Sequence, residues 1–113
     1  MIIGEWKTAT IASGGTLSAE VDLGRPYETL LVVVPTIDAA QINFLVAEKT
    51  GGTFQNLHVT DPADGGDNKV ISASGTGSFT WVVPLGGLQF IKVQASAAQT
   101  GGARSFRVCG ARS

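Results

Sequence analysis

The chain is poor in charged residues. Only 15% of its 113 residues are Asp, Glu, Lys or Arg, and the net charge is −1, whereas an average globular domain has about 25% charged residues. The densest basic group is Arg104, Arg107 and Arg112, which is too sparse to neutralise a row of phosphates. We therefore expect no nucleic-acid partner, and we expect other subunits to cover part of this weakly charged surface.

Cysteine and histidine are almost absent as well. The single cysteine, Cys109, excludes an internal disulfide. It lies in a predicted strand, where a free cysteine behaves as a small buried hydrophobe. The only histidine, His58, has no metal-ligand partners at a usable spacing, and nothing places it beside Cys109. We predict neither a thiol nucleophile nor a metal centre, and we expect no cofactor.

Long hydrophobic runs are missing. The longest aliphatic run, residues 30–34, ends at Pro35 and is far too short to span a bilayer. Residues 1–7 lack the basic start and long apolar stretch of a signal peptide. We expect a soluble protein that is made in the cytoplasm and has no membrane partner.

The sequence instead contains short strand signals separated by turn residues. Alternation at residues 17–23 is typical of a half-buried strand. The continuously apolar residues 29–34 predict a central strand covered on both faces and ended by Pro35. Residues 42–59 form the clearest hairpin, with its turn at residues 49–52.

Later strands are predicted at four further places, and most of the 15 glycines fall in the turns between strands. These strands are residues 69–73, 79–83, 88–95 and 104–109, separated by turns at 75–77, 84–87 and 99–102. About eight or nine short strands with glycine-rich turns predict an all-β fold, either a two-sheet antiparallel sandwich or a small barrel. Residues 1–113 are expected to form a single domain.

The longest polar loop carries three aspartates. Asp61, Asp64 and Asp67 offer oxygen ligands to calcium, but their spacing does not match an EF-hand. Asp, Asn, Pro and Gly are also the residues that a plain turn requires. A plain turn is favoured here, with calcium binding kept as the alternative.

The other ionisable residues do not suggest catalysis. Glu20 and Asp22 fall on the outward phase of an alternating strand, where solvent keeps a carboxylate ordinary, and Glu48 beside Lys49 is typical of a solvated turn. The Gly-Gly pairs follow strands but lead to no helix, so no phosphate-binding loop is present. We predict that the chain is not an enzyme.

Three aromatic residues permit a different function. Trp6, Tyr27 and Trp81 would suit a flat platform for sugar rings, as in carbohydrate-binding modules. Phe79 and Trp81, however, share one face of a strand, which is the expected arrangement for core packing. Core packing is favoured over a glycan platform.

Turns and core positions over residues 15–110 resemble small β-sandwich virion proteins of tailed bacteriophages. The matching segments are Leu17-Ser18-Ala19-Glu20-Val21-Asp22-Leu23-Gly24, the apolar strand ending in Pro35, Ile37-Asp38-Ala39-Ala40-Gln41-Ile42-Asn43-Phe44, Gly51-Gly52-Thr53-Phe54-Gln55-Asn56-Leu57 and Gly86-Gly87-Leu88-Gln89-Phe90-Ile91-Lys92-Val93. The resemblance implies a jelly-roll-like sandwich of about eight strands. It carries over no functional residue.

The resemblance implies a virion protein, made in the host cytoplasm, that decorates or cements the capsid as a homotrimer in contact with the major capsid protein. A neck, tail or head-fibre component is the alternative within this class, and a carbohydrate-binding module for host attachment is the alternative outside it. Met1, Ile2 and Ile3, before Trp6, are candidates for an arm at residues 1–4 that adds to a neighbouring subunit. A frayed first strand is the other interpretation of these residues.

Overall fold

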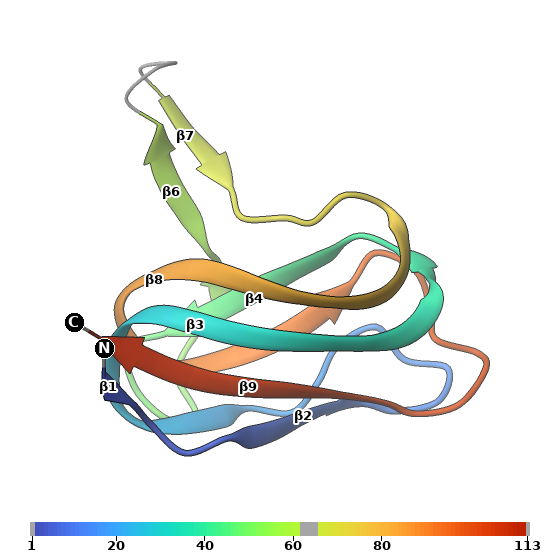
Figure 1. The fold of residues 1–113 in the computed structure, drawn as a ribbon, viewed down its shortest axis with the longest axis horizontal. Coiled ribbons are helices and arrows are strands. Elements are labelled where there is room, and N and C mark those ends of the chain that lie inside the picture. Colours follow the sequence, from blue (N-terminus) through green and yellow to red (C-terminus); the bar gives the residue numbers. More distant parts are fainter. Residues whose placement is uncertain (1, 62–65, 113) are drawn as a thin grey trace.

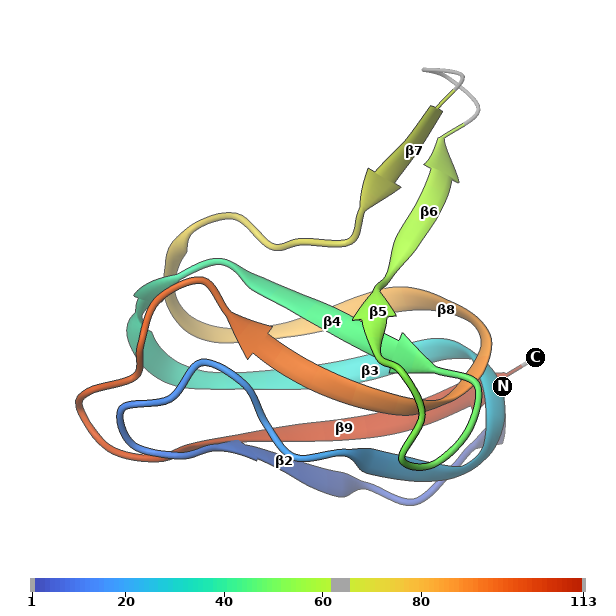
Figure 2. The same ribbon diagram turned by 180° about the vertical axis from the view of Figure 1, so that it is seen from behind.

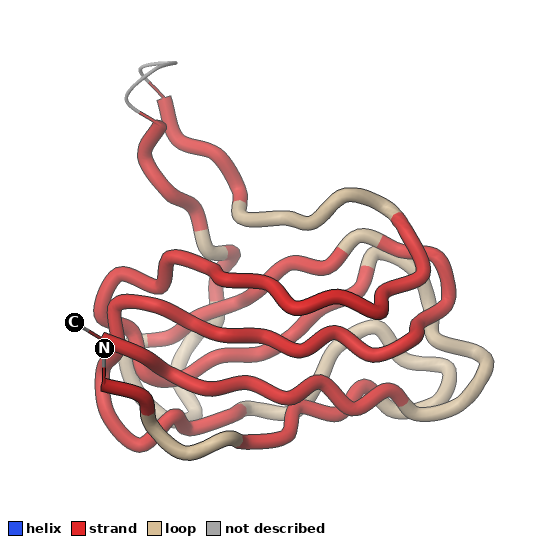
Figure 3. Tube along the Cα trace, in the orientation of Figure 1, coloured by secondary structure: helices blue, strands red, loops and turns tan. Residues whose placement is uncertain are grey.

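The computed structural model describes residues 2–61 and 66–112, and these contain strands and loops without any helix (Figures 1 and 3). The strands are β1 (Ile2–Ile3), β2 (Lys7–Ile11), β3 (Val21–Ala40), β4 (Ile42–Ala47), β5 (Gln55–Asn56), β6 (His58–Asp61), β7 (Gly66–Lys69), β8 (Gly75–Ala95) and β9 (Arg104–Arg112). The predicted all-β class is confirmed.

Two long strands, β3 and β8, form the frame of the molecule. They contain 20 and 21 residues and pair with each other along most of their length. Both bend at glycines with positive φ, at Gly24 (φ 95°) and at Gly86 and Gly87 (φ 71° and 94°). The predicted turn at residues 84–87 is therefore a bend inside a continuous strand, because glycine adopts this backbone conformation at no steric cost.

The bends divide the pairing into two layers, and every strand pair is antiparallel. The first layer has the order β2, β9, second half of β3, first half of β8, with β1 beside the end of β9. The second layer has the order start of β3, second half of β8, β4, β5. With each long strand counted as two halves, β2 pairs with β9, the start of β3 with the second half of β8, the second half of β3 with the first half of β8, and β4 with β5. This nested pairing of early strands with late ones is the pattern of a jelly roll. The predicted jelly-roll-like sandwich is confirmed.

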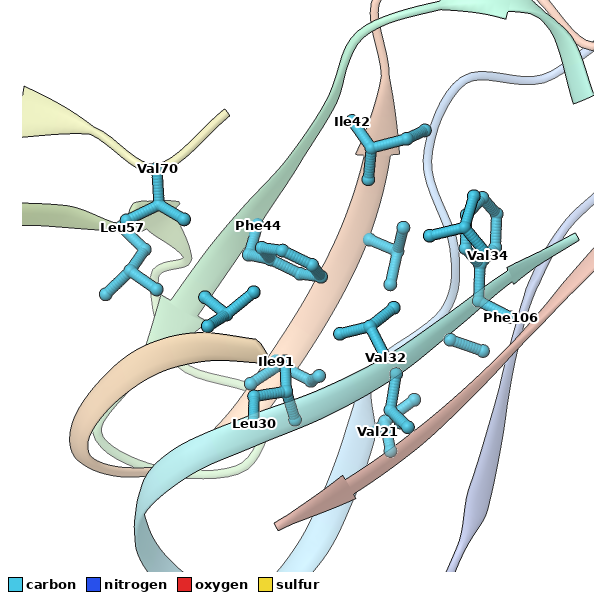
Figure 4. Packing of buried hydrophobic residues seen from close by; sticks show 14 of the residues in the cluster. Val21, Leu30, Val32, Val34, Ile42, Phe44, Leu57, Val70, Ile91 and Phe106 are labelled. Atoms are coloured by element: carbon cyan, nitrogen blue, oxygen red, sulfur yellow. The ribbon is translucent and has the colours of Figure 1, made fainter. Parts of the chain in front are cut away.

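The core lies between the two layers. Leu30, Val32 and Val34 of β3 point inward and are at most 2% exposed. They face Ile42 and Phe44 of β4, both 0% exposed (Figure 4). Burying such a side chain contributes about 1.5–3 kcal/mol.

The outward positions of β3 correct one prediction. Residues 29–34 were expected to be covered on both faces, but Leu31 is only partly buried and Val33 is 40% exposed. The run is apolar on both faces, whereas only the inner face meets another layer. The strand is central in its sheet, between β8 and β9, without being covered on its outer side.

Two further boundaries differ from the prediction. Pro35 does not end β3, because the ladder with β8 resumes at Thr36, which pairs with Gly77, and the strand continues through residues 38–40. The predicted return strand 53–59 is split: β5 pairs with β4 only at two positions, and β6 leaves to form a separate hairpin.

This second hairpin, β6–β7, projects from the sandwich (Figures 1 and 2). Its base is held by Leu57 and Val70, which are 6% and 7% exposed, and the Val70 amide donates to the Leu57 carbonyl at 2.9 Å. Asp61 and Asp67, predicted to lie in a polar loop, belong to its two strands. Asp64 lies outside the described residues, so the calcium alternative stays a prediction.

Candidate functional site

The outer side of the first layer carries exposed apolar side chains. Leu31 of β3 pairs directly with Val82 of β8, and Val33 lies one outward position further along β3. Val82 is 61% exposed and Val33 is 40% exposed. We call these three residues the outer apolar face. Exposed apolar surface on a sheet is a candidate for contact with another protein.

The predicted interface residues lie at the edge of the same layer. Ile2 and Ile3 form β1, pair with Arg112 and Ala111 of β9, and are each 52% exposed. Trp6 is 36% exposed. Met1 lies outside the described residues. The structure thus keeps these apolar side chains near the surface at one sheet edge, and their role as an interface stays a prediction.

The opposite edge of the layer, the first half of β8, borders a hollow of about 470 Å³ lined by residues 71–77, Phe79 and Trp81. The ring centroids of Phe79 and Trp81 are 6.4 Å apart, and Trp81 reaches Phe44 of the second layer at 5.4 Å. Trp81 packs on the core as predicted, but Phe79 is 39% exposed. We call this hollow the β8 slot.

The three aromatic residues suggested for a sugar platform do not share a face. Tyr27 is only 6% exposed. Its ring lies against Gly110 of β9, and its hydroxyl end lies against Gly4. Trp6 and Trp81 belong to opposite edges of the first layer. A platform built from these three rings does not form.

Asp38 holds a loop in place. Its carboxylate accepts hydrogen bonds from the amide and hydroxyl of Thr100 at 2.6 and 3.0 Å and from the Gly101 amide at 3.2 Å, and it pairs with the Arg104 guanidinium at 2.8 Å. The Thr100 bonds, then Arg104 and Gly101, hold the pKa of Asp38 below its ordinary value. The carboxylate has a structural role in these contacts.

Glu20 and Asp22 act in the same way. Glu20 accepts from the Thr50 hydroxyl at 2.6 Å and the Gly51 amide at 2.8 Å, and these bonds lower its pKa. Asp22 accepts from the Gln89 side-chain amide and the Gly24 amide, both at 2.8 Å, with the same effect on its pKa. Both carboxylates face outward as expected, but they are not ordinary, because each accepts hydrogen bonds that lower its pKa.

These carboxylates predict a loss of stability in acid. A group with a lowered folded-state pKa stabilises the fold above its unfolded pKa, and this contribution is lost as the pH falls through the folded-state value. We expect the thermal midpoint to stay level from pH 7 to about pH 5 and to fall below about pH 4. Circular dichroism melts at each pH would measure it.

The thermal midpoint of an Asp38→Asn variant should fall less steeply in acid, because one of the three carboxylates with a lowered pKa no longer titrates. Glu5→Gln is the matched control, since the Glu5 side chain is 80% exposed and its contact with Lys7, at 3.5 Å, is long and exposed. Superimposable melting profiles for Asp38→Asn and the unmodified protein would contradict the assignment.

Gln99 is a buried polar residue that sequence reasoning missed. It is 0% exposed, its side-chain oxygen accepts from the Asp38 amide at 2.8 Å, and its side-chain nitrogen donates to the Ala97 carbonyl at 3.1 Å. Its own amide donates to the Gly15 carbonyl at 3.0 Å. One residue therefore ties two loops to the end of β3.

The cysteine and the arginines considered in the sequence have structural surroundings. Cys109 is 0% exposed, and burial raises the pKa of its thiol, so the predicted buried cysteine is confirmed. Arg107 donates to the Thr8 hydroxyl, and Arg104 is paired with Asp38. Within the described ranges no three Asp, Glu, His or Cys residues are grouped as metal ligands. Across those same ranges no helix is long and apolar enough to cross a membrane.

No family model matches the sequence, and no curated protein matches it. Among solved structures, the SPBc2 prophage-derived protein YomS is 16% identical, with a TM-score of 0.56 over 97% of this chain and 95% of that chain. The C-terminal domain of A223, a structural protein of Sulfolobus turreted icosahedral virus, is 10% identical, with a TM-score of 0.39 over 97% and 99%. At these identities, the similarity to YomS shows a shared fold.

A chitosan-binding module of a chitosanase/glucanase from Paenibacillus sp. IK-5 is 16% identical, with a TM-score of 0.46 over 90% of this chain and 75% of that chain. A shared fold does not fix function, so the function of this chain has to be argued from its own surface.

Proposed function

We propose that this protein is a non-enzymatic structural component of a tailed-phage virion, namely a capsid decoration or cement protein that binds the major capsid protein. The outer apolar face carries the proposal, because Val33 and Val82 are exposed on a regular sheet. Rigid apolar surface suits docking onto another protein. Asp38, Glu20 and Asp22 meanwhile serve the fold.

Two further observations support this assignment. The fold similarity to a prophage-derived protein fits a phage origin. A small sandwich repeated over a capsid gains stability from many modest contacts, because multivalent attachment raises the effective concentration at each site. Self-association as a homotrimer and location in the virion belong to the same proposal.

Co-sedimentation tests the proposal. Virions produced from a phage genome lacking this gene are mixed with the purified protein and pelleted. Val82→Lys should reduce the bound fraction at least tenfold, because it places a charge in the outer apolar face. Leu17→Lys is the matched control, since Leu17 is 40% exposed but lies on the second layer, beside Gln94 of β8.

Failure of the unmodified protein to pellet with virions, or equal binding by both variants, would contradict the proposal. An electron-microscopy map of the decorated virion distinguishes the capsid surface from the neck, tail or head fibres. Density over the capsomers is the expected result.

A further inference from the structure

The first half of β8 is a sheet edge that no other strand of the described residues covers. Residues 77–83 pair with β3 on one side, and no strand within the described ranges pairs with them on the other. Natural edge strands are usually blunted by charged side chains, prolines or bulges. Here residues 70–91 contain no charged residue at all. An edge of this kind is a template for strand addition.

The β8 slot lies directly beside this edge. The slot is lined by residues 71–77 and by the side chains of Phe79 and Trp81. The Trp81 ring in turn lies 5.4 Å from the ring of Phe44 in the second layer. A strand laid along β8 would turn every second side chain toward these rings. The slot therefore fits an extended, weakly charged segment with apolar side chains.

The N-terminal segment of the chain has this composition. Ile2, Ile3 and Trp6 are 52%, 52% and 36% exposed, and Glu5 is the only charged side chain among residues 2–6. The segment is attached to its own sheet by two residue pairs with β9 and by the Gly4 amide, which donates to the Gly110 carbonyl at 2.8 Å. Its exposed apolar side chains still leave it with apolar surface to bury.

Strand direction also fits a second copy. β1 is antiparallel to β9, β9 to β3, and β3 to β8. β1 and β8 therefore run in opposite directions at opposite edges of one layer. A neighbour in the same orientation presents its N-terminal segment antiparallel to β8, as every strand pair within the described residues is. Contacts of this head-to-tail type close into rings when the rotation between copies permits.

We propose that residues 2–6 of one copy add as a strand to the free edge of β8 in the next copy and fill its β8 slot. Five residues span at most about 17 Å, so the two copies lie edge to edge, and the sheet continues from one to the next. This inference supplies the contact for the self-association included in the proposed function, and it rests on that function only for its role in a virion.

Light scattering after size-exclusion chromatography tests the contact. The unmodified protein should elute as a multiple of 11.6 kDa. Phe79→Lys should elute as a monomer, because it places a charge in the slot, while the exposure of Phe79 lets the lysine reach water and keeps the fold. Val82→Lys, the same change on the outer face of the same strand, should keep the oligomer. Circular dichroism verifies folding of each variant.

Cross-linking identifies the two partners. Ile3→Cys and Phe79→Cys chains, both carrying Cys109→Ser, are mixed and oxidised. A disulfide-linked dimer should form in the mixture and not in either chain alone. Monomeric unmodified protein at 100 μM, an oligomeric Phe79→Lys variant, or an oligomer without the cross-link would each overturn the inference.

The outcomes separate this inference from the proposed function. A monomer that still binds virions through Val82 refutes strand addition and retains the virion role. A ring that does not bind virions retains strand addition and refutes the virion role. Quenching of Trp81 fluorescence by a neutral oligosaccharide in a monomeric protein would assign the slot to a sugar and would also overturn the inference.

Discussion

Gly110→Ala is expected to lower the free energy of unfolding by about 3 kcal/mol, the upper end of the usual cost of overpacking. A Cβ atom at this position would overlap the ring of Tyr27. Tyr27 is 6% exposed, and Gly110 pairs with Leu30 inside the first layer, so neither side has room to move. Urea unfolding followed by fluorescence would measure the change.

Gly75→Ala is the matched control, because nothing lies within 4 Å of a Cβ built there and its φ is not positive. It should change the stability by less than about 0.5 kcal/mol. Combining Gly110→Ala with Tyr27→Leu should recover part of the loss, since the smaller side chain vacates the contested space. A cost below 1 kcal/mol for Gly110→Ala would contradict this prediction, because it would mean that the sheet shifts to make room for the methyl group.

Phe44→Ala is expected to cost about 3–5 kcal/mol, as large-to-small changes at fully buried phenylalanines do. Phe44 is 0% exposed and packs between the two layers (Figure 4). Its ring lies 5.4 Å from the ring of Trp81. Its removal leaves a cavity and frees the tryptophan. Chemical denaturation should show the lower stability, and the Trp81 emission should shift to longer wavelength.

Phe79→Ala provides the comparison, because the same side chain is 39% exposed there. It should cost less than about 1.5 kcal/mol in the isolated chain, since much of its surface stays in water in the folded state. Equal costs at the two positions would mean that the slot is closed in solution, in conflict with the structure.

The fold class could be predicted because strand alternation and turn residues are local signals. The lengths of β3 and β8 could not be predicted in the same way. Gly24, Gly86 and Gly87 have positive φ values that serve a turn or a bend equally well. Which of the two forms depends on pairing across the sheet, between residues about 60 positions apart.

The N-terminal apolar residues and the β8 slot were partly predictable for a similar reason. The apolar residues Ile2, Ile3 and Trp6 are visible in the sequence. Phe79 and Trp81 share a face, which suggested core packing, but whether that face is covered depends on β8 lying at a sheet edge. The charge-free stretch of residues 70–91 was the signal that could have drawn attention to this edge.

The hydrogen bonds that hold the loops could not be predicted from the sequence, for a third reason. Asp38 meets Gln99 and Arg104 across 61 and 66 positions, and Glu20 meets Thr50 across 30. No spacing rule connects residues so far apart. Their polar side chains therefore resembled ordinary surface residues until the layers had been placed.

The pairing of β2 with β9 joins residues 7–11 to residues 104–108, and this has a consequence for folding kinetics. Closing so large a loop costs chain entropy before the contact between its ends contributes any stabilisation. Folds rich in such distant contacts therefore reach the native state slowly. On a ribosome, β2 has to wait without its partner until the last strand has emerged. During that interval the uncharged first half of β8 is open to association with other nascent chains, so yield should improve when synthesis is slowed or a holding chaperone is abundant.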